Sequence, residues 1–533
     1  MDRYQRTGAI DDLESAIREK QKALDHFPSA PIFRLRSSRF LLNLYVTNNQ
    51  IALAHEAACT AVSLVPLLAP RFLRTSDKQH LLTDVVCLAS DAAAIALLVG
   101  KTLYDAISLL ELGRGVISNS LTEIRWDISD LQLKHPAMAR DFDNLRNQLD
   151  SPQGSEQTGS VYAAGRRLDE TIQQIRKLPT FERFLLALSE DEVMSAAVRG
   201  PIVVINVSRH GCDALILEQH QLRTLKLSSL QFDDIEARAE KLRDPQFVNL
   251  ELMEWLWDKV AEPILQSLGF IKAQRDVCPR IWWIPTGPLA SFPIHGAGRH
   301  SGSGDTVIDR VISSYSSSVS ALVRSRQNYS KSPELLGTSK IVLVGMEQTP
   351  SQKDLPFASL EVDRLATLCE NMKLQIKKPQ PFREQVITAV RDCTIFHFAG
   401  HGSTNPSDPS QSSMLLSDGE LTVADLFETN LHSQKPFLAY LSACGAGQMK
   451  HDGLINEGIH LIGAFQLAGF QHVIGTLWEV SDESCVTVAT RTYRRMKECG
   501  MSDDSVSEGL HHTCKVLRDQ WSLDNAKRIP RRH

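Results

Sequence analysis

Four almost continuously apolar runs in the C-terminal half constrain the fold of this chain more than any other feature. They are IVLVG (341–345), TIFHFAG (394–400), FLAYLSAC (437–444) and HVIGTLW (472–478). Strands that are buried on both faces have this composition, whereas strands with one face in water alternate apolar and polar residues. The runs therefore predict a parallel sheet that is covered by helices on both sides.

Helical patterns separate these apolar runs. They lie at about 359–372, 456–468 and 482–499. The second pattern has Asn456 at its start and Glu457 in its first turn, which predicts a helix with Asn456 as its N-cap. Strands that alternate with helices in this way predict an α/β/α sandwich with a mostly parallel sheet.

Shorter runs precede this region and have a different texture. Residues 202–208, 212–218 and 222–227 are β-branched or alternating and are separated by turn residues, which predicts a small antiparallel meander. The run IWWI (281–284) and a Gly/Pro-rich loop follow. That loop has neither G-K-S/T nor G-x-G-x-x-G before a helix, so no phosphate site is predicted there. We expect a β-rich subdomain at about 200–330 within a domain that spans 196–533.

The N-terminal part is rich in Leu and Ala and predicts helices. Two stretches 38 residues apart share a spacing of +7 and then +5: Ala16, Ala23 and Pro28, and Ala54, Ala61 and Pro66. This spacing resembles the second helix of a tetratricopeptide repeat. Generic amphipathic helices with fortuitous alanines remain the alternative. We expect an all-α repeat arm over 1–150, then a linker and a connecting helix (about 166–188) over 151–195.

Composition and charge narrow the classes of partner. The chain has 58 Lys and Arg against 63 Asp and Glu, so no basic surface for nucleic acid is expected. The ten cysteines include no C-x-x-C pair, which is typical of reduced thiols in a cytoplasmic protein. The N-terminus is polar, and the longest apolar stretch, 92–99, is shorter than the ~18 residues of a membrane span. We expect no membrane partner.

Two of the apolar runs end in residues with matched chemistry. One run leads into His401 and Gly402, and another leads into Cys444 and Gly445. If those strands are parallel neighbours, both side chains emerge at the same edge of the sheet. An imidazole there can take the proton of a thiol whose ordinary pKa is about 8.5. The N–H groups of Gly402 and Cys444 are then candidates for binding the oxyanion of a tetrahedral intermediate.

Structural roles compete with these assignments. A free cysteine at a strand end is often a small buried hydrophobe. His397 lies in the middle of its run between aromatic residues, and we interpret it as a packed core histidine.

Several segments resemble the CHAT domain, a caspase-like cysteine peptidase domain that is often fused to tetratricopeptide repeats. They are HFAGHG (397–402), LLSDGELTVADLF (415–427), LAYLSACGAG (438–447) and NEGIHLIGAFQLAGFQHVIGTLWEVSD (456–482). WWIPTGPLASFPIH (282–295) and RTGAIDDLESAI (6–17) are also similar to segments of this family. Ser442 stands where the caspase-type motif Q-A-C-[RQG]-G has Gln.

The resemblance implies a peptidase that needs no metal and no cofactor. His401 would act as the base, Cys444 would form a thioester with the peptide carbonyl, and the helical arm would recruit a protein substrate or a regulatory protein. The main alternative is a catalytically inactive scaffold or signalling adaptor. A non-proteolytic Cys/His hydrolase or acyltransferase is a more distant one.

Four acidic residues after the cysteine are candidates for a pocket that selects a basic substrate residue: Asp452, Glu457, Glu479 and Asp482. A carboxylate at a helix end or on the surface is the more common role for each of them. The family commonly continues into a terminal strand, whereas this chain ends in DNAKRIPRRH. If that edge strand is absent, we expect an incomplete sheet and a less stable domain.

Overall fold

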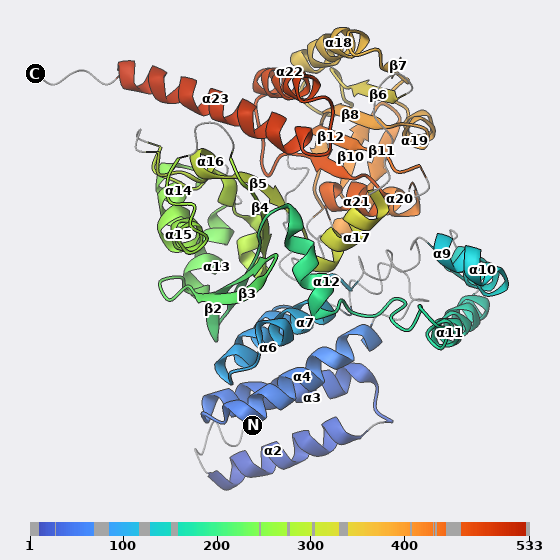
Figure 1. The fold of residues 1–533 in the computed structure, drawn as a ribbon, viewed down its shortest axis with the longest axis vertical. Coiled ribbons are helices and arrows are strands. Elements are labelled where there is room, and N and C mark those ends of the chain that lie inside the picture. Colours follow the sequence, from blue (N-terminus) through green and yellow to red (C-terminus); the bar gives the residue numbers. More distant parts are fainter. Residues whose placement is uncertain are drawn as a thin grey trace, which may run out of the picture.

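The computed structural model describes residues 10–26, 28–68, 81, 85–116, 128–150, 158–242, 244, 247–273, 278–300, 304–329, 339–405, 408–429, 431, 434–443 and 460–528. Helices form the N-terminal part, and two five-stranded sheets with their own helices form the rest (Figure 1). The fold is thus a helical segment followed by an α/β region, as the sequence predicted.

The N-terminal helices pack each against the next along the chain from α2 to α7. The helices before the first strand are α2 (Ile10–Asp25), α3 (Pro31–Thr47), α4 (Ile51–Leu68), α6 (Leu88–Leu98), α7 (Leu103–Gly113), α9 (Ser129–Lys134), α10 (Pro136–Asp150), α11 (Thr158–Ile175), α12 (Glu190–Ser195) and η2 (Ala196–Arg199). The connecting helix expected to reach residue 188 therefore ends at Ile175.

The predicted repeat alanines differ in their surroundings. Ala54 and Ala61 of α4 are fully buried, whereas Ala16 is half-buried and Ala23 is exposed. Pro66 lies inside α4 and does not terminate it. The two alanines of α4 therefore lie in a packed core, whereas Ala23 faces solvent.

Helix α4 has the length and hydropathy of a membrane-spanning helix. It packs between α3 and α6, and eight of its residues are buried, as in the core helix of a globular protein.

Strands β1–β5 form the N-terminal sheet, in the order β3-β2-β1-β4-β5. They are β1 (Ile202–Ser208), β2 (Gly211–Glu218), β3 (Gln221–Lys226), β4 (Arg280–Pro285) and β5 (Ile312–Tyr315). The first three are antiparallel, which confirms the predicted meander, and β4 and β5 run parallel to β1. The meander thus supplies three of the five strands of a larger mixed sheet.

Helices cover both faces of the N-terminal sheet. Helices α6 and α7 contribute Ala93, Ala106 and Ile107 to a core shared with Val204 and Trp282. The opposite face packs against α13 (Phe232–Lys241), α14 (Leu250–Leu256), η4 (Trp257–Ala261), α15 (Glu262–Ser267), η5 (Gly287–Ser291), η6 (Ile294–Gly296) and α16 (Val307–Arg310). Part of the helical segment therefore serves as a layer of the first sheet.

Strands β6, β7, β8, β12 and β13 form the C-terminal sheet, in the order β13-β12-β8-β6-β7, and every pair is parallel. They are β6 (Lys340–Gly345), β7 (Gln375–Lys377), β8 (Ile395–Gly400), β12 (Leu438–Ala443) and β13 (His472–Ile474). The four apolar runs are four of these strands, so the predicted parallel sheet is confirmed.

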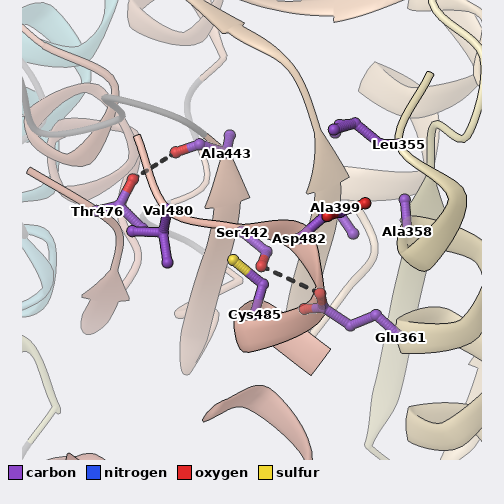
Figure 2. A pocket seen from close by; sticks show the side chains of 11 residues that line it. Leu355, Ala358, Glu361, Ala399, Ser442, Ala443, Thr476, Val480, Asp482 and Cys485 are labelled. Atoms are coloured by element: carbon purple, nitrogen blue, oxygen red, sulfur yellow. Dashed lines mark hydrogen bonds between the residues drawn. The ribbon is translucent and has the colours of Figure 1, made fainter. Parts of the chain in front are cut away.

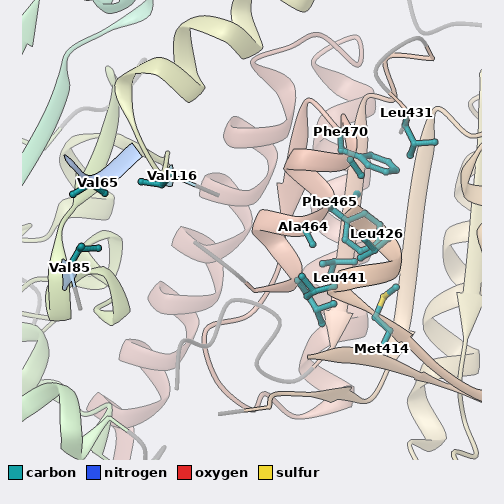
Figure 3. Close-up of a cluster of buried hydrophobic side chains, with 14 of the residues drawn as sticks. Val65, Val85, Val116, Met414, Leu426, Leu431, Leu441, Ala464, Phe465 and Phe470 are labelled. Atoms are coloured by element: carbon teal, nitrogen blue, oxygen red, sulfur yellow. The ribbon is translucent and has the colours of Figure 1, made fainter. Parts of the chain in front are cut away.

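Two helical layers enclose the C-terminal sheet. One face packs against α18 (Pro356–Glu370) and α22 (Asp482–Glu498). The other packs against α19 (Arg383–Val390), α20 (Val423–Glu428) and α21 (Leu461–Ala468). Figure 3 shows this second core, in which Phe465 of α21 lies near Leu426 and Leu441.

The start of α21 differs from the prediction. Its N-cap is His460, whose Nδ1 accepts a hydrogen bond from the N–H of Gly463 at 3.2 Å. The predicted N-cap at Asn456 is therefore wrong for this helix, and Asn456 itself lies outside the described residues. A histidine was not considered as a cap because Ser, Thr, Asp and Asn dominate that position.

The remaining elements are α17 (Val319–Tyr329), η7 (Pro409–Gln411), the antiparallel strands β9 (Gly402–Ser403), β10 (Ser413–Leu416) and β11 (Gly419–Thr422), and α23 (Ser505–Arg528). Helix α23 packs against α22 and also reaches β5 and α16 of the N-terminal sheet (Figure 1). Between β13 and Arg528, the described chain continues as helices and contains no further strand.

Candidate active site

The strands that precede the two predicted catalytic residues are parallel neighbours. Leu438 to Ala443 of β12 pair in register with Ile395 to Gly400 of β8. Gly400 and Ala443, the residues directly before His401 and Cys444, are partners in that register. The predicted adjacency of the strands is confirmed, whereas Cys444 lies outside the described residues.

His401 stands at the point where the strand order of the C-terminal sheet reverses. The chain runs from β6 outward to β7 and then returns to the other side of β6 with β8. Ligands of open α/β sheets bind at such a point, beyond the carboxyl ends of the strands. The loop after β6 therefore faces the end of β8.

A backbone carbonyl in that loop orients the imidazole. Nε2 of His401 lies 2.7 Å from the carbonyl oxygen of Lys353. A carbonyl oxygen can only accept, so Nε2 carries a proton and donates it. In the neutral ring Nδ1 is then the basic nitrogen. No orienting group had been predicted, because a backbone carbonyl leaves no side-chain signal in the sequence.

The glycines around His401 have separate structural roles. A Cβ on Gly400 would lie 2.8 Å from Cζ of Phe398 and 2.9 Å from Cβ of Met346, so only glycine fits without displacement. Gly402 belongs to β9 and pairs with Met414 of β10. The oxyanion role predicted for the N–H groups of Gly402 and Cys444 stays a prediction.

A small pocket of about 20 Å³ opens between the carboxyl ends of β8 and β12 (Figure 2). Its walls come from these strands, from α18 and from the segment that leads into α22. The lining residues are Leu355, Ala358, Glu361, Ala399, Gly400, Ser442, Ala443, Thr476, Val480, Asp482 and Cys485. They are mostly small or apolar, and two carry carboxylates.

The four acidic residues predicted for a substrate pocket have different outcomes. Asp482 lines the pocket, and its carboxylate also accepts from the N–H of Phe357 at 3.3 Å, near the start of α22. Asp482 thus lies both at the pocket and at a helix end, and its role in selecting a basic substrate residue stays a prediction. Glu479 is exposed and does not line the pocket. Asp452 and Glu457 lie outside the described residues.

The second carboxylate of the pocket, Glu361, was not predicted. It is 1% exposed, and one of its oxygens lies 2.9 Å from Nε2 of His397. The other accepts a hydrogen bond from the hydroxyl of Ser442 at 3.2 Å. The sequence contains a signal for this residue, because Glu361 is a charged residue within the apolar stripe formed by Ala358, Val362 and Leu365 of α18.

His397 is a buried core residue, as predicted, and both of its ring nitrogens have partners. Burial raises the pKa of Tyr493 well above its ordinary value, so the hydroxyl keeps its proton. That hydroxyl lies 3.4 Å from Nδ1 of His397. Nε2 faces the carboxylate of Glu361 and Nδ1 faces the hydroxyl of Tyr493, so each ring nitrogen has a hydrogen-bond partner. Tyr440, the register partner of His397, stacks on the ring at 4.8 Å.

In the part of the chain that the structure describes, no group of three or more His, Cys, Asp or Glu is arranged to hold a metal ion.

A parallel sheet between two helical layers, with a histidine at the carboxyl end of a central strand, is the architecture of a caspase-like domain. The model of the CHAT domain family matches residues 250–528, slightly more than half of the chain. The chain therefore belongs to the CHAT domain family, which is caspase-like and related to cysteine peptidases. No curated protein sequence matches the chain.

Proposed function

We propose that this protein is a cysteine endopeptidase that hydrolyses peptide bonds through His401 and Cys444. The observation that carries the proposal is the register of β8 and β12, in which the residues directly before His401 and Cys444 are partners. Membership of the CHAT family supports the reaction class. The proposal extends the register by one residue, to Cys444.

The orientation of His401 defines its part in the reaction. With Nε2–H donated to the carbonyl of Lys353, Nδ1 takes the thiol proton of Cys444. The thiolate adds to the peptide carbonyl, and the imidazolium returns the proton to the leaving amine as the C–N bond breaks. A water molecule then gives a proton to Nδ1 and adds to the thioester. The thiolate leaves and recovers that proton through His401, and the carboxylic acid is released.

The substrate preference that we propose is a basic residue before the scissile bond. Asp482 supports it, because its carboxylate lines the pocket beside the ends of β8 and β12. A guanidinium or ammonium group pairs well with a carboxylate in a confined site. The proposal further includes a protein substrate or regulator that binds the N-terminal helices, a cytoplasmic location, and no requirement for metal or cofactor.

The test combines peptide-library cleavage with an acyloxymethyl-ketone probe on the full chain. We expect the wild type to cleave and to be labelled at Cys444, and both signals to vanish in Cys444→Ala and fall at least 100-fold in His401→Ala. Circular dichroism should be the same for all three proteins.

A second thiol needs a matched control. Cys485 also lines the pocket, so labelling of the chain alone does not identify the nucleophile. Cys485→Ser should keep both cleavage and labelling. Undiminished cleavage in Cys444→Ala would overturn the peptidase assignment. Silence of the wild type in both assays would favour the inactive adaptor, whose binding to a partner should survive Cys444→Ala.

A further inference from the structure

A buried polar network lies beneath the candidate pocket, on the face of the C-terminal sheet that α18 and α22 cover. It runs from the hydroxyl of Tyr493 through His397 and the carboxylate of Glu361 to the hydroxyl of Ser442. Tyr493 and His397 are fully buried, and Ser442 is 9% exposed at the pocket. The network thus connects the helical layer to the end of β12.

Glu361 bridges two neighbouring strands. Side chains on one face of a strand recur at every second residue, so His397 and Ala399 of β8 share a face with Tyr440 and Ser442 of β12. Glu361 reaches over this face from α18 and binds His397 on one strand and Ser442 on the other. Figure 2 shows the carboxylate turned toward Ser442 at the side of the pocket.

Two side-chain hydrogen bonds hold the last two residues of β12. Ser442 donates to Glu361, and Thr476 donates to the carbonyl of Ala443 at 2.6 Å. Ala443 is directly followed by Cys444 in the sequence. A small displacement of a reacting group costs a large part of its rate, so the fixing of this strand end bears on the proposed nucleophile.

The buried carboxylate of Glu361 depends on its two hydrogen-bond partners. Taking a carboxylate out of water is costly, and removing one member of a buried pair leaves the other unsatisfied, whereas replacing a whole buried pair by apolar groups is often neutral or stabilising. The core between α18 and this face of the sheet is mainly apolar and includes Ala358, Val362, Leu365, Leu343 and Ala399. An apolar residue in place of Glu361 would leave Nε2 of His397 without this partner, so Glu361→Leu changes stability as well as the end of β12. Ser442→Ala leaves the pair of Glu361 and His397 intact.

We propose that Glu361 is a positioning residue that acts through Ser442 on the strand end carrying Cys444. The hydroxyl of Ser442 is the coupling element, and His397 holds the carboxylate from the opposite side. This inference rests on the proposed function, because it concerns the placement of the same nucleophile.

The network offers variants that separate positioning from stability. Ser442→Ala deletes the hydrogen bond between β12 and Glu361, and Ser442→Thr restores a hydroxyl. Tyr493→Phe deletes a hydrogen bond at the opposite end of the same network, among residues of the helical layer. Glu361→Leu removes the carboxylate at similar volume. All retain Cys444, His401 and the pocket carboxylate Asp482.

The experiment measures kcat, KM and the second-order rate of Cys444 alkylation by the probe, with the melting temperature of each variant. One hydrogen bond corresponds to about a tenfold effect. We expect Ser442→Ala and Glu361→Leu each to lower kcat and the alkylation rate about tenfold with KM within twofold. The double variant should lose no more than either single variant. Ser442→Thr should recover most of the loss.

The control should behave differently. Tyr493→Phe should lower the melting temperature but leave kcat within twofold. Unchanged alkylation and kcat in Ser442→Ala, or equal losses in Tyr493→Phe, would overturn the positioning role while the peptidase assignment stands. A wild type that is neither labelled at Cys444 nor active would overturn the proposed function and this inference with it.

Discussion

Two backbone features position His401: a carbonyl group that accepts a hydrogen bond from its ring, and a tightly packed glycine directly before it. Its ring donates to the carbonyl of Lys353, and the preceding Gly400 fits between Phe398 and Met346. Neither contact depends on an acidic third residue. The side chain of Lys353 is exposed, so its identity contributes little to the orientation of the imidazole.

At Lys353 the structure predicts tolerance to substitution. Lys353→Ala keeps the backbone carbonyl that accepts from His401, so kcat should remain within about twofold of wild type. Peptidase kinetics and probe alkylation of Cys444 measure this. A tenfold loss would mean that the lysine ammonium itself takes part.

At Gly400 the structure predicts that even a substitution by alanine destabilises the fold. Gly400→Ala brings a methyl group to 2.8 Å from Phe398 and 2.9 Å from Met346, which must shift the end of β8. Overpacking of this kind costs about 1–3 kcal/mol of the free energy of unfolding. Urea unfolding measures the loss, and Ala399→Ser on the neighbouring position serves as a milder control. An unchanged midpoint for Gly400→Ala would contradict the packing described for β8.

At the scale of elements, helix pairs and helix ends carry the specific interactions. Gly113 lets α7 approach α6, because a Cβ there would lie 2.8 Å from Cβ of Ala89 and 3.3 Å from Val62. At the other end of the chain, His460 caps α21 through Nδ1. Both elements pack on a sheet, so a local change in either affects a core.

The contact of α7 with α6 predicts a steric effect. Gly113→Leu should lower the free energy of unfolding by about 1–3 kcal/mol, because the added side chain would overlap Ala89 and crowd Val62, which are both buried. Leu112→Ala is the matched control on the same helix, since Leu112 is 42% exposed and its loss should cost under about 0.5 kcal/mol. Thermal and urea unfolding measure both variants. Equal losses of stability in Gly113→Leu and Leu112→Ala would contradict the close approach of the two helices.

The cap of α21 predicts a dependence of stability on pH. Burial lowers the pKa of His460 from an ordinary 6.5 to about 4, so the unfolded chain binds a proton that the folded chain excludes. The stability contributed by the neutral cap is therefore complete above pH 6.5 and falls as the pH drops from 6.5 towards 4. His460→Asn keeps a capping oxygen that does not titrate and should flatten this part of the profile. A profile identical to wild type would exclude His460 as its source.

At the scale of the whole molecule, the end of the chain joins the two sheets. Asp504, directly before α23, binds Arg280 of β4 at 2.6 Å, and Asp503 binds Arg199 of η2. Farther along α23, Arg518 makes two hydrogen bonds, of 2.8 and 3.0 Å, with Asp309 of α16. The helix therefore packs on the C-terminal sheet through α22 and is tied to the N-terminal sheet by ion pairs.

The tie at Asp309 predicts a loss of stability when its partner is removed. Burial acts to raise the pKa of Asp309, but hydrogen bonds from Arg518 and Thr306, with the charges of Arg518 and Lys515, lower it to about 2. Arg518→Ala leaves this carboxylate, 12% exposed, with a weaker set of partners and should cost about 1–3 kcal/mol. Urea unfolding measures the change.

A matched variant and the pH profile test the same pair. The stability from this carboxylate should be present above its unfolded pKa of about 3.9 and should fall as the pH drops towards 2. Arg518→Ala should make that acid dependence shallower. Asp519→Ala is the control, because Asp519 pairs with Arg518 while its side chain is 55% exposed, and it should change little. Equal losses in both variants would contradict a specific role for the pair with Asp309.

The sequence alone determined the class of fold and the two strand ends that matter. Continuous apolar runs such as 341–345 and 394–400 specify strands buried on both faces, and such strands need helices on either side. Since a strand ends where its apolar run ends, the position of His401 followed from local pattern. The meander at 202–227 followed in the same way from alternation and turn residues.

Only the tertiary structure decided which distant groups meet. The carbonyl of Lys353 orients His401 across 48 residues, and Glu361 reaches Ser442 across 81. Helices α6 and α7, which the sequence assigned to an arm, cover a sheet that begins at Ile202. Periodicity reports that a residue is buried but not against what, because partners in a core are set by how elements pack and not by local spacing.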